Sequence, residues 1–407
     1  MILKHLSLTN FRNYARLDAD LPEGLLLLVG DNAQGKTSLI EAIYFLSTLT
    51  SFHAESDRQL IQFFAAREPL AVARIVGDFQ RGGKTHRLEV RIIHENGGLN
   101  GGVRVRKEVL LDGVKQKLAE AVGQFNAVIF LPHSLQIIEG TPEERRRFLN
   151  LALGQVIPNY TAALSEYGRA LSQRNALLKQ LNERGGDPSQ LDFWDDELSE
   201  YGAMLIHARI QAVQELEQLA SPLHLQLTQG KDTLRMDYQP SYDPLPQPAG
   251  QYGLGLDTAV NRLGINREAI QEGMKQRLKR LRQEEIVRGV TTIGPHRDEL
   301  RFLGNGVDLG AYGSRGQVRT ATLALKFAEL HWMKGKTGEW PLFLLDEVLA
   351  ELDPQRRIDL LFRLGECEQA LLTTTDIHLF DTHFVRKANI WHVAAGQIQM
   401  EEARDES

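Results

Sequence analysis

The sequence has few features of a secreted or membrane protein. Its 407 residues include a single cysteine, Cys367, so an internal disulfide is excluded. The longest purely aliphatic run covers residues 25–29, far below the roughly 20 apolar residues that a membrane-spanning helix needs. Residues 1–5 lack the basic stretch followed by an apolar run that begins a signal peptide. We therefore expect a cytoplasmic protein with no membrane partner.

An excess of positive charge is also missing. The chain has 47 Lys and Arg residues against 53 Asp and Glu residues, for a net charge of −6 and a pI of about 6.1. Proteins that bind nucleic acid usually carry a basic face. The overall charge therefore argues against DNA as a partner unless local clusters supply the contacts, and it predicts weak, salt-sensitive binding.

Strand and helix signals alternate at both ends of the chain, and its length suggests two or three structural units. Residues 25–29 form a continuous apolar run that is typical of a strand buried on both faces. Apolar residues then recur at helical spacing over residues 36–49. Residues 70–131 are rich in strand signals, and strands and helices alternate again from residue 291. These patterns predict an α/β fold.

Residues 158–219 differ in pattern from both ends. Apolar residues recur at spacings of three and four on each side of a turn at residues 185–188, with Arg174 in one slot. This spacing predicts two antiparallel helices, an arm of about 40 Å. Residues 228–258 are rich in Pro, Gly and Tyr and predict a loop, and a charged helix over residues 267–288 follows.

We therefore expect three segments. Residues 1–150 form the first part of a head with an antiparallel β subdomain, residues 151–289 form a helical arm, and residues 290–407 form the second part of the head.

Residues 30–37 match the phosphate-loop pattern G-x-x-x-x-G-K-[ST] in full. They lie between the predicted buried strand and the predicted helix, where backbone N–H groups and a helix N-terminus can surround a phosphate. Lys36 is expected to reach the β- and γ-phosphates of ATP, and Thr37 to ligate Mg²⁺. The flanking elements disfavour the alternative of a chance glycine-rich turn. The predicted nucleotide contacts are Gly30, Asp31, Asn32, Ala33, Gln34, Gly35, Lys36 and Thr37.

A second apolar run, residues 342–345, ends in Asp346 and Glu347. A central strand that ends in a carboxylate is how many ATPases hold Mg²⁺, so Asp346 is the expected metal ligand. Glu347 is the expected general base that polarises the attacking water. The alternative is a buried strand that ends in acidic loop residues. About 300 residues separate this run from the phosphate loop, which requires a large insertion inside one ATPase fold.

A third motif consists of Ser314, Arg315, Gly316 and Gln317, before a predicted amphipathic helix. Ser and Gly at a helix start provide an anion-binding N-terminus, and a simple helix cap is the alternative. The stretch resembles the signature motif of ABC ATPases, in which Ser-Gly-Gln of one subunit contacts the γ-phosphate held by the other.

The same resemblance assigns two further sites. Asp353 lies in a stretch that resembles the ABC D-loop, which crosses the dimer interface. Thr375 and Asp376 lie where ABC proteins carry a switch residue, usually His, and His378 is close by.

Four stretches resemble the RecF family of bacterial recombination mediators. They are residues 10–14, 140–149, 294–298 and 312–320, with sequences that include NFRNY, GTPEERRRFL, GPHRD and YGSRGQ. The resemblance implies an ABC-type P-loop ATPase head with a mixed sheet, flanking helices and an inserted helical arm. His133 departs from the family pattern, which usually has Glu after Pro132.

The resemblance also implies function. ATP is expected to drive homodimerisation, and the dimer to bind duplex DNA near single-strand gaps. RecR, and RecO through it, are the expected protein partners in loading RecA, and slow hydrolysis is expected to reset the clamp.

Three basic clusters are candidate contacts to DNA phosphates. They are Arg104, Arg106 and Lys107; Arg145, Arg146 and Arg147; and Lys275, Arg277, Lys279, Arg280 and Arg282. The alternative for each cluster is a solvated surface or ion pairs with nearby Glu residues.

Two other functions remain open at this point. One is an SMC-like or transporter-associated ABC head whose main partner is another protein, although the predicted arm disfavours a transporter subunit. The other is a metabolic P-loop kinase, which would have no use for residues 314–317.

Overall fold

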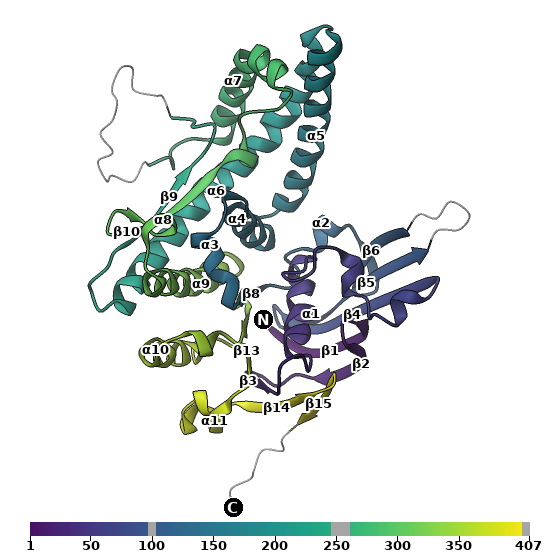
Figure 1. Ribbon diagram of the computed structural model, residues 1–407, viewed down its shortest axis with the longest axis vertical. Helices are drawn as coiled ribbons and strands as arrows, with labels where there is room; N and C mark the ends of the chain where they lie inside the picture. Colours follow the sequence, from purple (N-terminus) through teal and green to yellow (C-terminus); the bar gives the residue numbers. More distant parts are fainter. Residues whose placement is uncertain (97–102, 246–260, 401–407) are drawn as a thin grey trace, which may run out of the picture. The chain divides into compact units, whose positions relative to one another are not determined.

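The computed structural model describes residues 1–96, 103–245 and 261–400 (Figure 1). The chain divides into two compact units. We call Met1–Ser134 together with Glu329–Ser407 the head unit, and Leu135–Ala328 the arm unit.

The first sheet of the head unit consists of β3 (Gly24–Val29), β8 (Ala127–Phe130), β12 (Leu342–Asp346), β13 (Gln369–Thr374), β14 (Asn389–Ala394) and β15 (Gln397–Met400). Its order is β15-β14-β3-β13-β12-β8, and only the β14–β15 pair is antiparallel. β8, β12 and β13 are buried along their whole length. Burial on both faces accounts for the continuous apolar runs in the sequence.

The second sheet of the head unit consists of β1 (Ile2–Phe11), β2 (Tyr14–Asp20), β4 (Leu70–Arg81), β5 (Lys84–Asn96), β6 (Val103–Leu111) and β7 (Val114–Gln116). It is antiparallel, with the order β2-β1-β4-β5-β6-β7. This sheet is the β subdomain that the sequence predicted.

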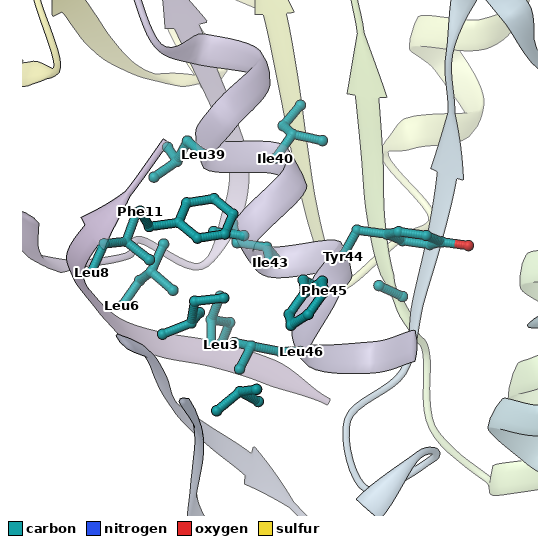
Figure 2. Close-up of a cluster of buried hydrophobic side chains, with 14 of the residues drawn as sticks. Leu3, Leu6, Leu8, Phe11, Leu39, Ile40, Ile43, Tyr44, Phe45 and Leu46 are labelled. Atoms are coloured by element: carbon teal, nitrogen blue, oxygen red, sulfur yellow. The ribbon is translucent and has the colours of Figure 1, made fainter. Parts of the chain in front are cut away.

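Helix α1 (Lys36–Thr48) contacts both sheets and is buried at most of its positions. Figure 2 shows the apolar residues that it shares with β1: Leu3, Leu6, Leu8 and Phe11 from the strand, and Leu39, Ile40, Ile43, Tyr44, Phe45 and Leu46 from the helix. Because α1 begins directly after the phosphate loop, this core fixes the position of the loop.

The remaining helices of the head unit are α2 (Leu118–Ala121), α10 (Pro354–Leu364) and α11 (Thr382–Lys387), with 3₁₀ turns at Asp57–Leu60, Ala65–Arg67, Val348–Glu351 and Ile377–Leu379. Another turn, Pro132–Leu135, and the long helix α9 (Arg315–Thr337) span the division between the units.

The arm unit contains α3 (Gln136–Glu139), α4 (Pro142–Val156), α5 (Tyr160–Arg184), α6 (Leu191–Leu227), α7 (Arg267–Arg288) and α8 (Leu309–Tyr312). It also contains a small antiparallel sheet of β9 (Leu234–Gln239), β10 (Glu299–Gly304) and β11 (Val307–Asp308), and 3₁₀ turns at Pro188–Gln190 and Pro295–Arg297. Helices α5 and α6 form the predicted hairpin, and α7 packs against both.

Buried ion pairs help to hold the arm helices together. Arg174 has no exposed side-chain surface and lies 2.8 Å from Asp195 and 2.7 Å from Glu285. This accounts for the Arg in an apolar slot of the sequence pattern, since buried charges need partners.

The structure differs from the sequence prediction in two respects. The predicted loop over residues 228–258 was wrong for Leu234–Gln239, which form β9 through alternately buried Leu234, Met236 and Tyr238; residues 246–258 lie outside the described residues. The predicted segments divided at residues 150 and 290, whereas the compact units divide near residues 134 and 328, because α4 and β10 pack with elements of the arm unit.

Among the helices of the described ranges, none is both long enough and apolar enough to cross a membrane.

Candidate functional site

The phosphate loop lies between β3 and α1 in the head unit. Two positions of the loop must be glycine, because a side chain there would clash with neighbouring residues. A Cβ at Gly30 would lie 2.3 Å from the carbonyl oxygen of Val393, and a Cβ at Gly35 would lie 2.7 Å from Asn13 Nδ2. Gly35 also has φ of 120°, a conformation that favours glycine. The loop is therefore packed tightly against its own sheets.

Lys36 points into this loop and is almost fully buried. Its Nζ donates to the carbonyl oxygens of Gly30, at 2.7 Å, and Asp31, at 2.9 Å. It also lies 3.2 Å from Glu347 Oε1. The structure thus brings together the two residues that the sequence assigned to phosphate contact and water activation.

Thr37 and Asp346 also meet, although they come from distant parts of the sequence. The Thr37 hydroxyl donates to Asp346 Oδ2 at 2.9 Å. Burial raises the pKa of Asp346, and hydrogen bonds from Thr373 and Thr37 oppose that rise. A carboxylate beside a hydroxyl is a set of hard oxygen donors, and such donors suit Mg²⁺.

Thr373 is a site residue that the sequence analysis missed. Its hydroxyl donates to Asp346 Oδ1 at 2.6 Å and accepts from the backbone N–H of Glu347 at 2.9 Å. Glu347 itself has φ of 51°, in the left-handed region, so this hydrogen bond helps to hold a strained backbone. The available signal was strand register, because Thr373 lies opposite Asp346 in the β12–β13 pair.

A pocket of about 1170 Å³ opens over these residues, and its lining belongs entirely to the head unit. The loop residues Asn32, Ala33, Gly35, Lys36 and Thr37 line it, together with Asp346 and Glu347. Another part of its wall is formed by Arg12 and residues 56–67. A pocket of this size is large enough for a nucleoside triphosphate.

Three predicted loop contacts, Gly30, Asp31 and Gln34, lie outside the pocket lining, and Gln34 holds the loop to neighbouring segments. Its side-chain oxygen accepts from the backbone N–H of Ala395 at 2.6 Å, and its backbone oxygen accepts from Gly396 at 3.0 Å and from Asn13 Nδ2 at 3.2 Å. Gln34 therefore helps to position the phosphate loop.

Arg12, from the NFRNY stretch, connects α1 to the pocket wall. Its guanidinium donates to both oxygens of Glu41, at 2.6 and 2.8 Å, and to the carbonyl oxygen of Gln59 at 3.1 Å. Glu41 is almost fully buried and also accepts from the Ser51 hydroxyl. A bidentate pair in such surroundings fixes geometry well, so the wall is firmly attached to the helix that follows the phosphate loop.

The signature-like residues lie at the N-terminus of α9, in the arm unit. The Ser314 N–H donates to Gln317 Oε1 at 3.0 Å, and the Gln317 N–H donates to Ser314 Oγ at 3.3 Å. This is a capping box, so the motif does cap a helix. Ser314, Arg315 and Gly316 are exposed at the same time, which leaves the helix N-terminus open to an anion.

The D-loop and switch residues lie outside the pocket lining. Asp353 caps α10 by accepting from the N–H of Arg356 at 3.1 Å. Asp376 accepts from the N–H of His378 at 2.8 Å, and both Thr375 and Asp376 are exposed. Within the described chain these residues act as helix caps or loop positions, and their contact with a nucleotide stays a prediction.

The departure at His133 lies near the site. Pro132 lines the pocket, whereas the ring of His133 lies 6.4 Å from that of Phe52. Of these two residues, Pro132 therefore forms part of the pocket wall and His133 does not.

In the first two basic clusters, Arg104 and Arg147 are exposed, and the other four residues form ion pairs or hydrogen bonds. Arg106 pairs with Glu108 and Glu95, and Lys107 pairs with Asp57. Arg145 forms a bidentate pair with Glu299 at 2.6 and 2.8 Å, and Arg146 donates to the carbonyl oxygen of Asp298. These contacts connect the ERRRF stretch to the GPHRD stretch.

The third cluster is engaged in a similar way, by acidic residues of α6. Lys275 lies 2.5 Å from Asp196, Lys279 lies 3.9 Å from Asp192, and Arg282 contacts Asp192 and Asp195. Arg277 and Arg280 of this cluster are exposed on α7. Ion pairing, which the sequence offered as the alternative to DNA contact, is therefore present in each cluster. Most of the acidic partners are not the Glu residues that lie closest in the sequence.

The fold and the site define an ATPase head of the ABC type with an inserted helical arm. The family model described as RecF/RecN/SMC N terminal domain matches residues 2–395. A solved SmcHead, bound to the C-winged helix domain of ScpA, has a TM-score of 0.50 at 14% identity and covers 98% of both chains. At this identity the likeness shows the fold alone.

More similar proteins narrow the assignment. The chain is 39% identical to DNA replication and repair protein RecF of Roseiflexus castenholzii and 38% identical to that of Chloroflexus aurantiacus, covering 98% of this chain and 99% of each relative. The solved recombination mediator protein RecF-ATP in the RecFOR pathway has a TM-score of 0.80 at 30% identity, over 98% of this chain and 97% of that one. The chain belongs to the RecF family.

Proposed function

We propose that this protein is an ATP-dependent DNA-binding clamp in recombinational DNA repair and replication. The observation that carries the proposal is the meeting of Lys36, Thr37, Asp346 and Glu347 in one pocket of the head unit. The names of the relatives, DNA replication and repair protein RecF, support the biological role.

Each site residue has a distinct part in ATP hydrolysis. Lys36 and the backbone N–H groups of residues 30–37 bind the β- and γ-phosphates. Thr37 and Asp346 would hold Mg²⁺, which neutralises charge on the phosphates when it is bound. Glu347, which lines the pocket, accepts a proton from the attacking water.

Ser314, Arg315, Gly316 and Gln317 complete the site from a second copy of the chain. Their support is the exposed, capped N-terminus of α9, which offers N–H groups to a γ-phosphate. Asp353, Thr375 and Asp376 are assigned to the same dimer interface by their positions in the ABC pattern. ATP then drives homodimerisation, and slow hydrolysis opens the dimer again.

The dimer binds duplex DNA near single-strand gaps and acts with RecR, and with RecO through RecR, in loading RecA. A solved relative is described as a recombination mediator protein in the RecFOR pathway, and this description supports the partnership. Arg277 and Arg280 on α7 are exposed candidates for phosphate contact, and Arg104 on β6 is another.

An SMC-like head whose main partner is another protein is the second candidate. The ion pairing within all three basic clusters favours it, because a paired cation releases fewer counterions on binding DNA.

The test is the molecular mass in solution of the Glu347→Gln variant, with and without ATP and Mg²⁺, and then with gapped duplex DNA. A mass that doubles with ATP and increases further with DNA supports the clamp. A mass that doubles with ATP but does not change with DNA favours the protein-partner function. A mass that stays monomeric contradicts both.

A further inference from the structure

The pocket extends well beyond the phosphate loop, onto a wall formed by residues 56–67. Ser56, Arg58, Gln59, Ile61, Gln62, Phe63, Phe64, Ala66 and Arg67 line that wall. The triphosphate and its metal account for only the part near Lys36 and Asp346. The remaining volume is open to the nucleoside of a nucleotide whose triphosphate lies on the loop.

The wall is held in place by the end of β1. The Arg12 N–H donates to Leu60 O and the Gln62 N–H donates to Asn10 O, both at 2.8 Å, around a bridge between Phe11 and Ile61. Leu60 and Ile61 are buried in the head core. The wall is therefore a fixed surface of the pocket.

Two aromatic rings and a guanidinium cover the outer part of this wall. Phe63 and Phe64 are 65% and 71% exposed and pack edge to face, with ring centroids 5.6 Å apart. Arg67 lies over the Phe63 ring at 4.4 Å from its centroid. We call Phe63, Phe64 and Arg67 the aromatic wall. Such exposure is unusual for Phe and favours a flat apolar ligand.

Tyr14, an aromatic residue that contacts the loop at Gly35, offers no such surface. Tyr14 is fully buried, and its hydroxyl donates to the carbonyl oxygen of Gly35. Phe63 and Phe64 supply the aromatic rings in the pocket lining.

We propose that the aromatic wall binds the nucleobase of the nucleotide by stacking, and so contributes to nucleotide affinity without taking part in hydrolysis. This inference rests on the proposed ATP-binding function of the pocket. Bases stack well on aromatic rings and on the plane of an arginine. Because the wall is joined to α1 through Arg12 and Glu41, a stacked base would be fixed relative to the phosphate loop.

The test compares two ligands that differ in the base. Binding of ATP–Mg²⁺ and of inorganic tripolyphosphate–Mg²⁺ is measured by calorimetry for the full-length protein and for a Phe63→Ala/Phe64→Ala variant. We expect ATP affinity to fall by about 10-fold or more, the scale of one lost stacking contact, while tripolyphosphate affinity stays the same. Phe362→Ala is the matched control, because Phe362 is 79% exposed on α10 and lies outside the pocket lining.

Two outcomes would overturn the inference, and a third would contradict the proposed function on which it rests. ATP affinity that stays unchanged in the double variant would show that the base does not use this wall. An equal loss for both ligands would show that Phe63 and Phe64 act on the phosphate loop itself. Failure of the unmodified protein to bind either ligand would instead contradict the proposed function of the pocket.

Discussion

The GPHRD stretch is predicted to stabilise the arm unit through a buried charge network centred on Asp298. Asp298 is 1% exposed and accepts hydrogen bonds from Arg209 at 2.9 Å, from the N–H of Ser241 at 2.9 Å and from the Tyr238 hydroxyl. Arg209 is equally buried and also donates to the carbonyl oxygen of Pro295 at 2.6 Å. The network joins α6, β9 and the GPHRD turn.

Removing one partner of this pair leaves a buried charge without compensation. Asp298→Ala should therefore cost about 3–5 kcal/mol in the free energy of unfolding, a large share of the roughly 5–15 kcal/mol that stabilises a typical domain. Urea denaturation followed by circular dichroism measures this loss. Arg297→Ala is the matched control, because Arg297 is the exposed neighbour in the same turn, and it should cost less than about 0.5 kcal/mol.

A double variant separates the charge pair from simple loss of packing. Arg209→Met with Asp298→Ala should be less destabilised than the sum of the two single variants, because neither charge is then left alone. A loss of under about 1 kcal/mol for Asp298→Ala, or full additivity in the double variant, would refute the assignment of a structural role to GPHRD.

Three further predictions follow from the head unit. Lys36→Ala should abolish ATP-dependent dimerisation, measured by light scattering, because the β- and γ-phosphate contacts are lost; Lys4→Ala, an alteration of a Lys outside the pocket lining, should dimerise normally. Glu347→Gln should bind ATP but hydrolyse it at least about 100-fold more slowly in a phosphate-release assay, and unchanged turnover would exclude Glu347 as the base. The Arg74 hydrogen bond, helped by Arg91, holds the pKa of Glu89 at about 2, so this carboxylate stabilises the fold above its ordinary pKa of 4.5 and the contribution is lost as pH falls toward 2. Glu89→Gln should accordingly flatten the stability profile in that range by about 1–2 kcal/mol, and an unaltered acid profile would contradict the assignment.

The sequence predicted the parts of this protein that local patterns encode. The apolar runs of β3, β8 and β12 were visible because these strands are buried on both faces. The phosphate loop was visible because its glycines and Lys36 have fixed spacing. The helical hairpin followed from apolar spacing, and the RecF family from short stretches along the chain.

Features that depend on contacts between distant residues were not visible in the sequence. Thr373 is one threonine in a run of three, and only its register opposite Asp346 gives it a place in the site. β9 has only six residues and lies among Pro, Gly and Tyr residues. The composition of the whole segment therefore predicted a loop. The basic clusters could not be divided into paired and exposed cations, because their partners come from other elements.

The central claim is that each ATP site is shared between two copies of the chain, and mixing two inactive variants tests it most directly. Lys36→Ala alters the phosphate loop, and Ser314→Arg alters the signature motif. In a shared site, a mixed dimer contains one intact loop facing one intact motif. An equimolar mixture should therefore regain hydrolysis, up to about half of the unmodified rate, since one of the two sites in each mixed dimer is intact. A mixture as inactive as either variant alone would contradict the shared site.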